Sequence, residues 1–248
     1  MTLRLFVQTA LAAGSELVLP EAAARHAMVR RVQPGTLLML FDGGGSDWPA
    51  EVVAMSRSSV TVRVGQPLAV QRELRQPVTV ALAMPANERM DLLVEKATEL
   101  GVAQIQPLHS ERSVLRLSGE RALRKRAHWQ AIAQAACEQC GRARVPRVGP
   151  VMSMIDWLPQ APLGQRWLLS LQADAQAAPA WGLTDTALCT LSGPEGGFTA
   201  DEEVAARQAG FVAVDLGPRV LRAETAPLAV LSWLGLQCAA PDGRFNTR

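Results

Sequence analysis

The sequence lacks the features of a membrane-spanning, secreted or disordered protein. It has no tyrosine, aromatic residues make up only 4% of its 248 residues, and charged residues make up 19%. No uncharged apolar run approaches the roughly 18–20 residues that span a membrane, and the N-terminus lacks the apolar core of a signal peptide. Because 48% of the residues are hydrophobic, the chain can bury a core, which argues against disorder. We therefore expect a cytoplasmic protein with no membrane partner.

Cysteine is scarce as well. The four cysteines are too few and too scattered for a disulfide framework, so we expect reduced thiols. Cys137 and Cys140 form a single C-x-x-C pair late in a predicted helix, whereas structural zinc sites use four ligands. We predict that this pair serves packing and that the protein holds no metal.

Lysine is rarer still, because Lys96 and Lys125 are the only two among the 25 lysines and arginines. The net charge is +2, but residues 112–147 contain nine basic and two acidic residues, a local charge of +7 that leaves −5 on the rest of the chain. A second basic group comprises Arg25, His26, Arg30 and Arg31. This concentration is typical of a polyanion-binding face, although a solvated helix face gives the same count.

Turn chemistry and hydrophobic patterns divide the chain into two predicted domains, residues 1–72 and 73–248. The first has short apolar or alternating runs separated by turns such as Gln33-Pro34-Gly35, a pattern typical of a small β-barrel. A helix over residues 21–31, opened by Pro20, carries the N-terminal basic group. The predicted strands are 3–7, 17–19, 37–41, 50–54 and 60–64.

The second domain alternates strands with helices, which predicts a mainly parallel α/β sheet. Thr199 and Glu202 match a capping box that starts one helix, and Gly210 ends it. Residues 172–180, rich in alanine and glutamine, are predicted to form a loop. The predicted strands are 78–84, 102–107, 167–171, 187–192 and 212–216. The predicted helices are 88–100, 120–140, 199–209 and 225–238.

Two glycine-containing segments follow consecutive predicted strands of this domain. They are residues 192–198 (SGPEGGF) and residues 216–226 (LGPRVLRAETA). Ligands of open parallel sheets bind at the carboxyl ends of strands, and glycine lets a ligand approach the backbone. Neither segment is a G-x-G-x-x-G or Walker sequence, which disfavours a nicotinamide-dependent oxidoreductase. One such turn alone is commonly structural, but two in succession favour a binding site.

These segments also carry a family resemblance. Together with MDLLVEKATELGV (90–102), SERSV (110–114), HAMVRRVQPG (26–35) and a spaced series from Trp129 to Arg142, they closely resemble the RsmE family. Members of that family are SPOUT-class methyltransferases that methylate N3 of a uridine in 16S ribosomal RNA. The resemblance covers essentially the whole chain.

The resemblance implies an α/β enzyme with a SPOUT-type trefoil-knotted parallel sheet and a smaller N-terminal PUA-like β-barrel domain. Pattern alone would predict an unknotted sheet. The resemblance also implies a homodimer, 16S rRNA in the assembled small ribosomal subunit as partner, and S-adenosylmethionine bound in the knotted segments, mostly by backbone groups. The implied cofactor-binding residues are Leu171, Gly193, Glu195, Gly196, Gly197, Leu216, Gly217, Val220, Leu221 and Arg222.

Methylation of uridine N3 requires the N3 proton to leave, so the enzyme must stabilise the uracil anion with a cation. We assign this role to Arg222 first and Arg219 next. Glu195 or Glu224 would accept the proton, and the sequence does not choose between them. The predicted RNA-binding residues are Arg4, Arg25, His26, Arg30, Arg31, Arg112, Arg124, Lys125, Arg126, Arg142 and Arg144.

The sequence departs from the family pattern in two places. Ala86 and Asn87 stand where the family commonly has Lys-Gly, which removes one RNA cation, and Ala223 stands where many members have threonine. Neither change affects the glycines, so we expect cofactor binding to be retained. The alternative function is an RNA-binding ribosome-assembly protein without methyltransferase activity, against which the intact glycine segments argue.

Overall fold

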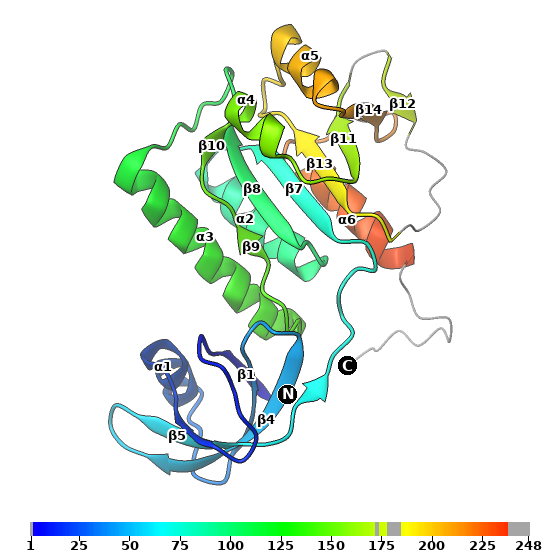
Figure 1. The fold of residues 1–248 in the computed structure, drawn as a ribbon. Coiled ribbons are helices and arrows are strands. Elements are labelled where there is room, and N and C mark those ends of the chain that lie inside the picture. Colours follow the sequence, from blue (N-terminus) through cyan, green and yellow to red (C-terminus); the bar gives the residue numbers. More distant parts are fainter. Residues whose placement is uncertain (1, 172–173, 178–184, 238–248) are drawn as a thin grey trace. The chain divides into compact units, whose positions relative to one another are not determined.

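The computed structural model describes residues 2–171, 174–177 and 185–237 (Figure 1). The chain divides into two compact units, Met1–Glu73 with Gln134–Val145, and Leu74–Ala133 with Pro146–Arg248. Residues 134–145 lie in the predicted second domain, yet they group with the N-terminal unit. The reason is specific bonding, because Glu138 Oε1 accepts a hydrogen bond from the Phe6 N–H at 2.9 Å and Arg142 is paired with Glu73.

The N-terminal unit contains a mixed sheet whose strands run in the order β1-β3-β4-β5-β2, with β6 paired to β4. Alternating residues of these strands, such as Leu38 and Leu40, are buried in one core together with Ala24 and Ala27 of α1. The element bounds are β1 Leu3–Phe6, β2 Glu16–Val18, α1 Glu21–Val29, β3 Leu37–Phe41, β4 Ser46–Met55, β5 Val60–Val64 and β6 Leu68–Ala69.

Strand β4 is longer than the predicted strand 50–54. The predicted strand begins only after Pro49, and proline is disfavoured inside a central strand. Pro49 nevertheless sits in register with Met39 of β3, and its carbonyl accepts a hydrogen bond from the Gly65 N–H at 2.7 Å. The first residues of the strand, Ser46 and Asp47, pair with β6.

The second unit is built on a parallel sheet, as the alternation of strands and helices predicted. Its strand order is β10-β8-β7-β13-β11-β14-β12, with β9 beside β8, and each pairing in the described residues is parallel. The late strand β13 thus lies between β7 and β11. The strands are β7 Val78–Ala83, β8 Gln104–His109, β9 Arg147–Val148, β10 Met152–Ser153, β11 Gln165–Leu169, β12 Gln176–Ala177, β13 Leu188–Ser192 and β14 Val212–Asp215.

Helices cover this sheet. α2 and α6 contact each other and lie side by side behind β7 and β13 (Figure 1). Ala81, Leu108 and Leu191 of the sheet pack with Trp157 and Phe211 in one buried cluster. The helices are α2 Asn87–Glu99, α3 Gly119–Cys140, α4 Met154–Trp157, the 3-10 helix η1 Leu158–Gln160, α5 Ala200–Gln208 and α6 Thr225–Gln237. In the described part of the chain, no helix is long and apolar enough to cross a membrane.

The capping box predicted for α5 is confirmed, since the Glu202 N–H donates to Thr199 Oγ1 at 3.2 Å and the Thr199 N–H donates to Glu202 Oε2 at 2.9 Å. The predicted loop 172–180 contains the short strand β12, which pairs with β14, and residues 172–173 and 178–180 lie outside the described residues. Residue 238, the predicted last residue of the final helix, lies outside them as well.

Candidate cofactor site

Three neighbouring strands, β13, β11 and β14, end at the same edge of the parallel sheet and open into one cavity. β11 pairs with β13 on one side and with β14 on the other. The segments that follow these strands line a cavity of about 460 Å³. All but one of the predicted cofactor residues line it, namely Leu171, Gly193, Glu195, Gly196, Gly197, Leu216, Val220, Leu221 and Arg222. The predicted residues that line the cavity come from three separate segments of the chain, with Leu171 and Arg222 as the two extremes.

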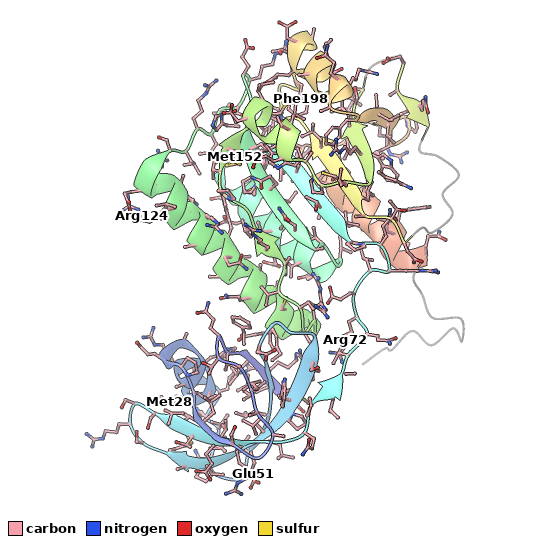
Figure 2. The ribbon with its side chains drawn as sticks, viewed as in Figure 1. Met28, Glu51, Arg72, Arg124, Met152 and Phe198 are labelled. Atoms are coloured by element: carbon pink, nitrogen blue, oxygen red, sulfur yellow. The ribbon has the colours of Figure 1, made fainter. Side chains whose placement is uncertain are left out.

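The segment 192–198 needs its glycines for steric reasons. A Cβ atom on Gly193 would lie 3.0 Å from the Phe198 nitrogen and 3.1 Å from Gly197 Cα, closer than side chains are normally tolerated. Gly197 has a φ of +68°, and its N–H donates to the Pro194 carbonyl at 2.9 Å to close a turn. Phe198, labelled in Figure 2, is buried in the core and anchors the end of the segment.

Arg112 supports this turn. Its Nη1 donates to the Gly196 carbonyl at 2.9 Å and to the Phe198 carbonyl at 3.2 Å, and the residue lines the cavity. Arg112 belongs to the basic stretch that is predicted to bind RNA, and that role stays a prediction. Its contacts also give it a part in shaping the cavity.

The segment 216–226 forms another wall of the cavity. Gly217, with a φ of +103°, does not line it; the Gly217 N–H donates to Asp215 Oδ1 at 2.9 Å and turns the chain after β14. Gly217 thus turns the backbone beside the cavity, and its contact with the cofactor stays a prediction. Leu171 and Val220 line the cavity with side chains that remain largely exposed, so apolar surface borders its opening.

Two carboxylates, Glu195 of segment 192–198 and Glu224 of segment 216–226, form ion pairs with the same residue, Arg89. Arg89 Nη1 lies 3.1 Å from Glu195 Oε1, and Arg89 Nε lies 3.8 Å from Glu224 Oε1. The Glu195 side chain lines the cavity and is 37% exposed, whereas the Glu224 side chain is 7% exposed and does not line it. Sequence reasoning missed Arg89, because nothing local connects it to Glu195, which lies 106 positions later.

The residues present fit S-adenosylmethionine. The cavity volume is within the range of small-molecule sites, and Gly193, Gly196 and Gly197 line it with backbone that carries no side chain. The Ser192 hydroxyl lines the same cavity, is buried, and has no hydrogen-bond partner among the described residues. A buried hydroxyl without a partner is costly, which suits a ligand that bonds to it.

Two predicted RNA-binding arginines are corrected by their burial. Arg4 is 11% exposed, pairs with Asp47 at 2.6 Å, and stacks over the Phe41 ring at 5.0 Å. The Arg142 side chain is 4% exposed and pairs with Glu73. Both guanidiniums are therefore used to hold the N-terminal unit together and are not presented to a phosphate backbone.

The remaining predicted RNA-binding residues differ in how far they are engaged. Arg25 pairs with Glu21 on the surface, His26 Nδ1 lies 3.1 Å from Glu138 Oε2, and Arg126 Nε donates to the Val148 carbonyl at 3.0 Å. Lys125 is half-buried. Arg124 projects from α3 (Figure 2). The residues that are exposed are Arg25, Arg30, Arg31, Arg124 and Arg144.

Two buried cysteines, Cys137 and Cys189, have thiols with raised pKa values. Burial raises the pKa of Cys189 to about 12, and a hydrogen bond with Cys140, together with burial, raises the pKa of Cys137. Both remain protonated at neutral pH, which disfavours nucleophilic or redox chemistry at either. Within the described residues, no group of three or more His, Cys, Asp or Glu side chains is placed to hold a metal ion.

Comparison with known protein families agrees with this geometry. A family model described as an RNA methyltransferase domain matches residues 72–235, and one described as an RNA methyltransferase PUA domain matches residues 19–65. The first match includes the whole parallel sheet and the cavity at its edge. The fold and the site thus define an RNA methyltransferase domain preceded by a smaller domain.

Individual relatives indicate which family of RNA methyltransferases the chain resembles. A protein named Ribosomal RNA small subunit methyltransferase E from Mycobacterium bovis is 34% identical over 85% of this chain and 82% of its own length. Its namesake from Bacillus subtilis is 30% identical over 84% and 85%. The crystal structure of the Neisseria gonorrhoeae enzyme of that name bound to S-adenosyl methionine has a TM-score of 0.90 and 35% identity, covering 96% of this chain and 98% of that one. The chain belongs to the ribosomal RNA small subunit methyltransferase E (RsmE) family, which confirms the resemblance found in the motifs.

Proposed function

We propose that this protein transfers a methyl group from S-adenosylmethionine to N3 of a uridine in the 16S RNA of the small ribosomal subunit. The observation that carries the proposal is the glycine-lined cavity at the carboxyl ends of β13, β11 and β14. Relatives of the same family bear the name of a small-subunit rRNA methyltransferase, and two solved relatives, from Neisseria gonorrhoeae and Legionella pneumophila, contain S-adenosylmethionine.

When bound, S-adenosylmethionine supplies the methyl group: its S–CH3 bond breaks as the N3–CH3 bond forms, and the bonding electron pair stays on sulfur. The chain contributes mainly positioning. The backbone of Gly193, Gly196 and Gly197 would form one wall for the cofactor, and Leu171 and Val220 would provide apolar surface for it. Ser192 donates or accepts a hydrogen bond at the base of the cavity.

Arg222 stabilises the uracil anion, with Arg219 as its neighbour. Both line the cavity, and the described residues form no hydrogen bond or ion pair with either guanidinium. A cation aimed at an oxygen of the uracil lowers the cost of removing the N3 proton.

Glu195 accepts that proton. Of the two carboxylates considered from the sequence, only Glu195 lines the cavity, whereas Glu224 is 7% exposed and lies behind the wall. The N–H bond breaks, its electron pair remains on N3 and forms the bond to the methyl carbon, and the proton passes from Glu195 to water. Glu195 is thus the general base.

The exposed arginines Arg25, Arg30, Arg31, Arg124 and Arg144 bind phosphates of the RNA, and His26, Lys125 and Arg126 add to these contacts. Binding of this kind weakens steeply as salt concentration rises, because each phosphate contact releases counterions.

The proposal extends to fold details and assembly. Residues 1–72 form a PUA-like barrel, residues 73–248 form a SPOUT domain with a trefoil knot, and two copies form a cytoplasmic homodimer that acts on the assembled subunit. The position of β13 between β7 and β11 supports a chain path more complex than a simple doubly wound sheet. The apolar residues of α6 include the exposed Ala229 and Leu236, which supports burial of this helix against a second copy.

The test is methylation of small ribosomal subunits that lack the modification, with labelled S-adenosylmethionine and mass spectrometry of the nucleosides. We expect a single 3-methyluridine. The matched control is Gly193→Val, whose side chain enters the space occupied by Gly197 and abolishes cofactor binding. No incorporation by a protein that still binds S-adenosylmethionine would overturn the proposal in favour of a ribosome-assembly role without activity.

A further inference from the structure

We propose that Arg89 is a positioning residue that holds the Glu195 carboxylate in place to remove the uridine N3 proton. The inference rests on the proposed function and deepens it. Arg89 lies in the first turn of α2. α2 follows β7, and β7 pairs in parallel with β13, so the start of α2 and the segment after β13 meet at the same edge of the sheet.

One oxygen of Glu195 is fixed by two donors. Arg89 Nη1 donates to Glu195 Oε1 at 3.1 Å, and the Ala86 N–H donates to the same oxygen at 3.4 Å. Ala86 is the N-cap residue of α2 and its side chain makes no capping hydrogen bond, so Glu195 brings a carboxylate to this end of the helix from another part of the chain. A carboxylate is favoured at this end of a helix because the helix dipole is positive there.

The other oxygen of Glu195 is left for the reaction. The described residues form no hydrogen bond with Glu195 Oε2, and the residue lines the cavity. Anchoring of one oxygen restricts the rotation of the carboxylate, so that the second oxygen is held in one place. A base oriented by a third group is the arrangement that efficient proton transfer requires.

Glu224 explains why the anchor is an arginine. Its side chain is 7% exposed, Oε2 is buried without a partner, and Oε1 lies 3.8 Å from Arg89 Nε. One guanidinium thus lies between two carboxylates from the two segments that form the cavity. Without it, the two like charges would repel each other, and Glu224 would be a buried charge with no counterion. Because the guanidinium is a planar fork, Arg89 donates to Glu195 through Nη1 while its Nε faces Glu224 at ion-pair distance, so one arginine serves both carboxylates.

The experiment is a double-mutant cycle of Arg89→Gln and Glu195→Gln in the full-length protein. We measure kcat and KM on unmodified small subunits, and the dissociation constant of S-adenosylmethionine by calorimetry. We expect Glu195→Gln to lower kcat about a hundredfold and Arg89→Gln to lower it about tenfold. The double variant is expected to match Glu195→Gln alone, because Arg89 acts through Glu195. The cofactor dissociation constant is expected to stay within about threefold of the wild-type value.

Two further variants separate positioning from folding. Arg89→Lys keeps the charge and is expected to recover part of the lost kcat. Arg75→Gln is the matched control, since it removes an arginine of the same unit that pairs with Asp185 at 2.6 Å on the surface, and it is expected to leave kcat unchanged. Should Arg89→Gln fail to fold, Arg89→Lys and the double variant, which removes one negative and one positive charge together, still complete the comparison.

Three results would overturn the inference. The effects of the two substitutions could multiply in the double variant, or Arg89→Gln could retain the full kcat. Arg89→Gln could also weaken cofactor binding with no change in kcat at saturation. The wild-type protein run in parallel distinguishes the two failures. If it forms no 3-methyluridine, the proposed function fails. If it does and Arg89→Gln retains full kcat, only the role of Arg89 fails.

Discussion

Arginine side chains have different structural roles in the two units of this protein. In the N-terminal unit, Arg4 and Arg142 are buried against Asp47 and Glu73. At the cavity of the second unit, Arg219 and Arg222 are exposed, and the described residues form no ion pair with either. The residue type is the same, but the partner differs. A cation whose charge is already balanced by a buried carboxylate stabilises the fold, whereas a cation left facing a cavity is available to a ligand.

Arg222→Ala gives the largest expected effect and tests the cavity side of this comparison. We expect kcat to fall about 10²–10³-fold, equivalent to about 3–4 kcal/mol of activation free energy, because the uracil anion loses its nearest cation. Cofactor affinity should change little, since that contact is made mainly by backbone. Single-turnover methylation and calorimetric titration measure the two quantities. Full turnover with normal cofactor binding would show that Arg222 is not the stabilising cation.

Arg142→Ala tests the other side of the comparison. We expect the free energy of unfolding to fall by about 2 kcal/mol, somewhat less than for a fully buried pair because the Glu73 side chain is 29% exposed and can be hydrated. Denaturant titration measures this change. The control Arg63→Ala removes an exposed ion pair with Glu16 and should cost less than about 0.5 kcal/mol. If folded Arg142→Ala lost RNA affinity but no stability, the structural role would be wrong.

Arg112→Ala addresses a residue that belongs to both categories, because it is exposed and yet holds the turn 192–198. Loss of its two hydrogen bonds to the Gly196 and Phe198 carbonyls should raise the cofactor dissociation constant about tenfold. Arg116→Ala is the control, since its Nη2 bonds only the Glu111 carbonyl, at 2.7 Å, away from this cavity. Calorimetry that gave equal cofactor affinity for both variants would remove Arg112 from the site.

Arg31 gives the smallest effect and separates binding from stability at one position. It has a φ of +56° just after α1, where glycine is normally preferred. Arg31→Gly should raise the free energy of unfolding by about 0.5 kcal/mol, because relief of backbone strain exceeds the entropy cost of glycine. It should also weaken RNA binding about threefold. Arg31→Ala should weaken RNA binding equally with no gain in stability. Thermal melts measure the stability and filter binding measures the RNA affinity, and a gain in stability for Arg31→Ala would contradict the prediction.

Local features of the chain were predictable from the sequence. The capping box at Thr199 and Glu202 depends on residues three positions apart, and the glycines of 192–198 determine their own turn. The position of the cavity followed from the rule that parallel strands end at a common edge. Nine of the ten predicted cofactor residues line it, and the exception, Gly217, turns the backbone beside it.

Features that depend on distant partners were not predictable. Arg4 and Arg142 look like other arginines in the sequence, because their carboxylate partners lie 43 and 69 positions away. Arg89 was overlooked for the same reason. Strand order was not predictable either, because no local sequence pattern indicates that β13 pairs with β7 across more than 100 intervening residues. These ion pairs and the strand order depend on contacts between residues far apart in the chain, and short stretches of a single sequence do not reveal such contacts.

The helix α3 has a consequence for how this protein can be divided. Its first turns belong to the second unit, and its last turns belong to the N-terminal unit, where Glu138 bonds Phe6 and His26. The chain therefore passes between the units three times, and a single cut releases neither one whole. A fragment ending at residue 72 would lose the carboxylate that holds β1 and α1. Any transfer of the intact N-terminal unit to another protein would therefore have to include residues 134–145.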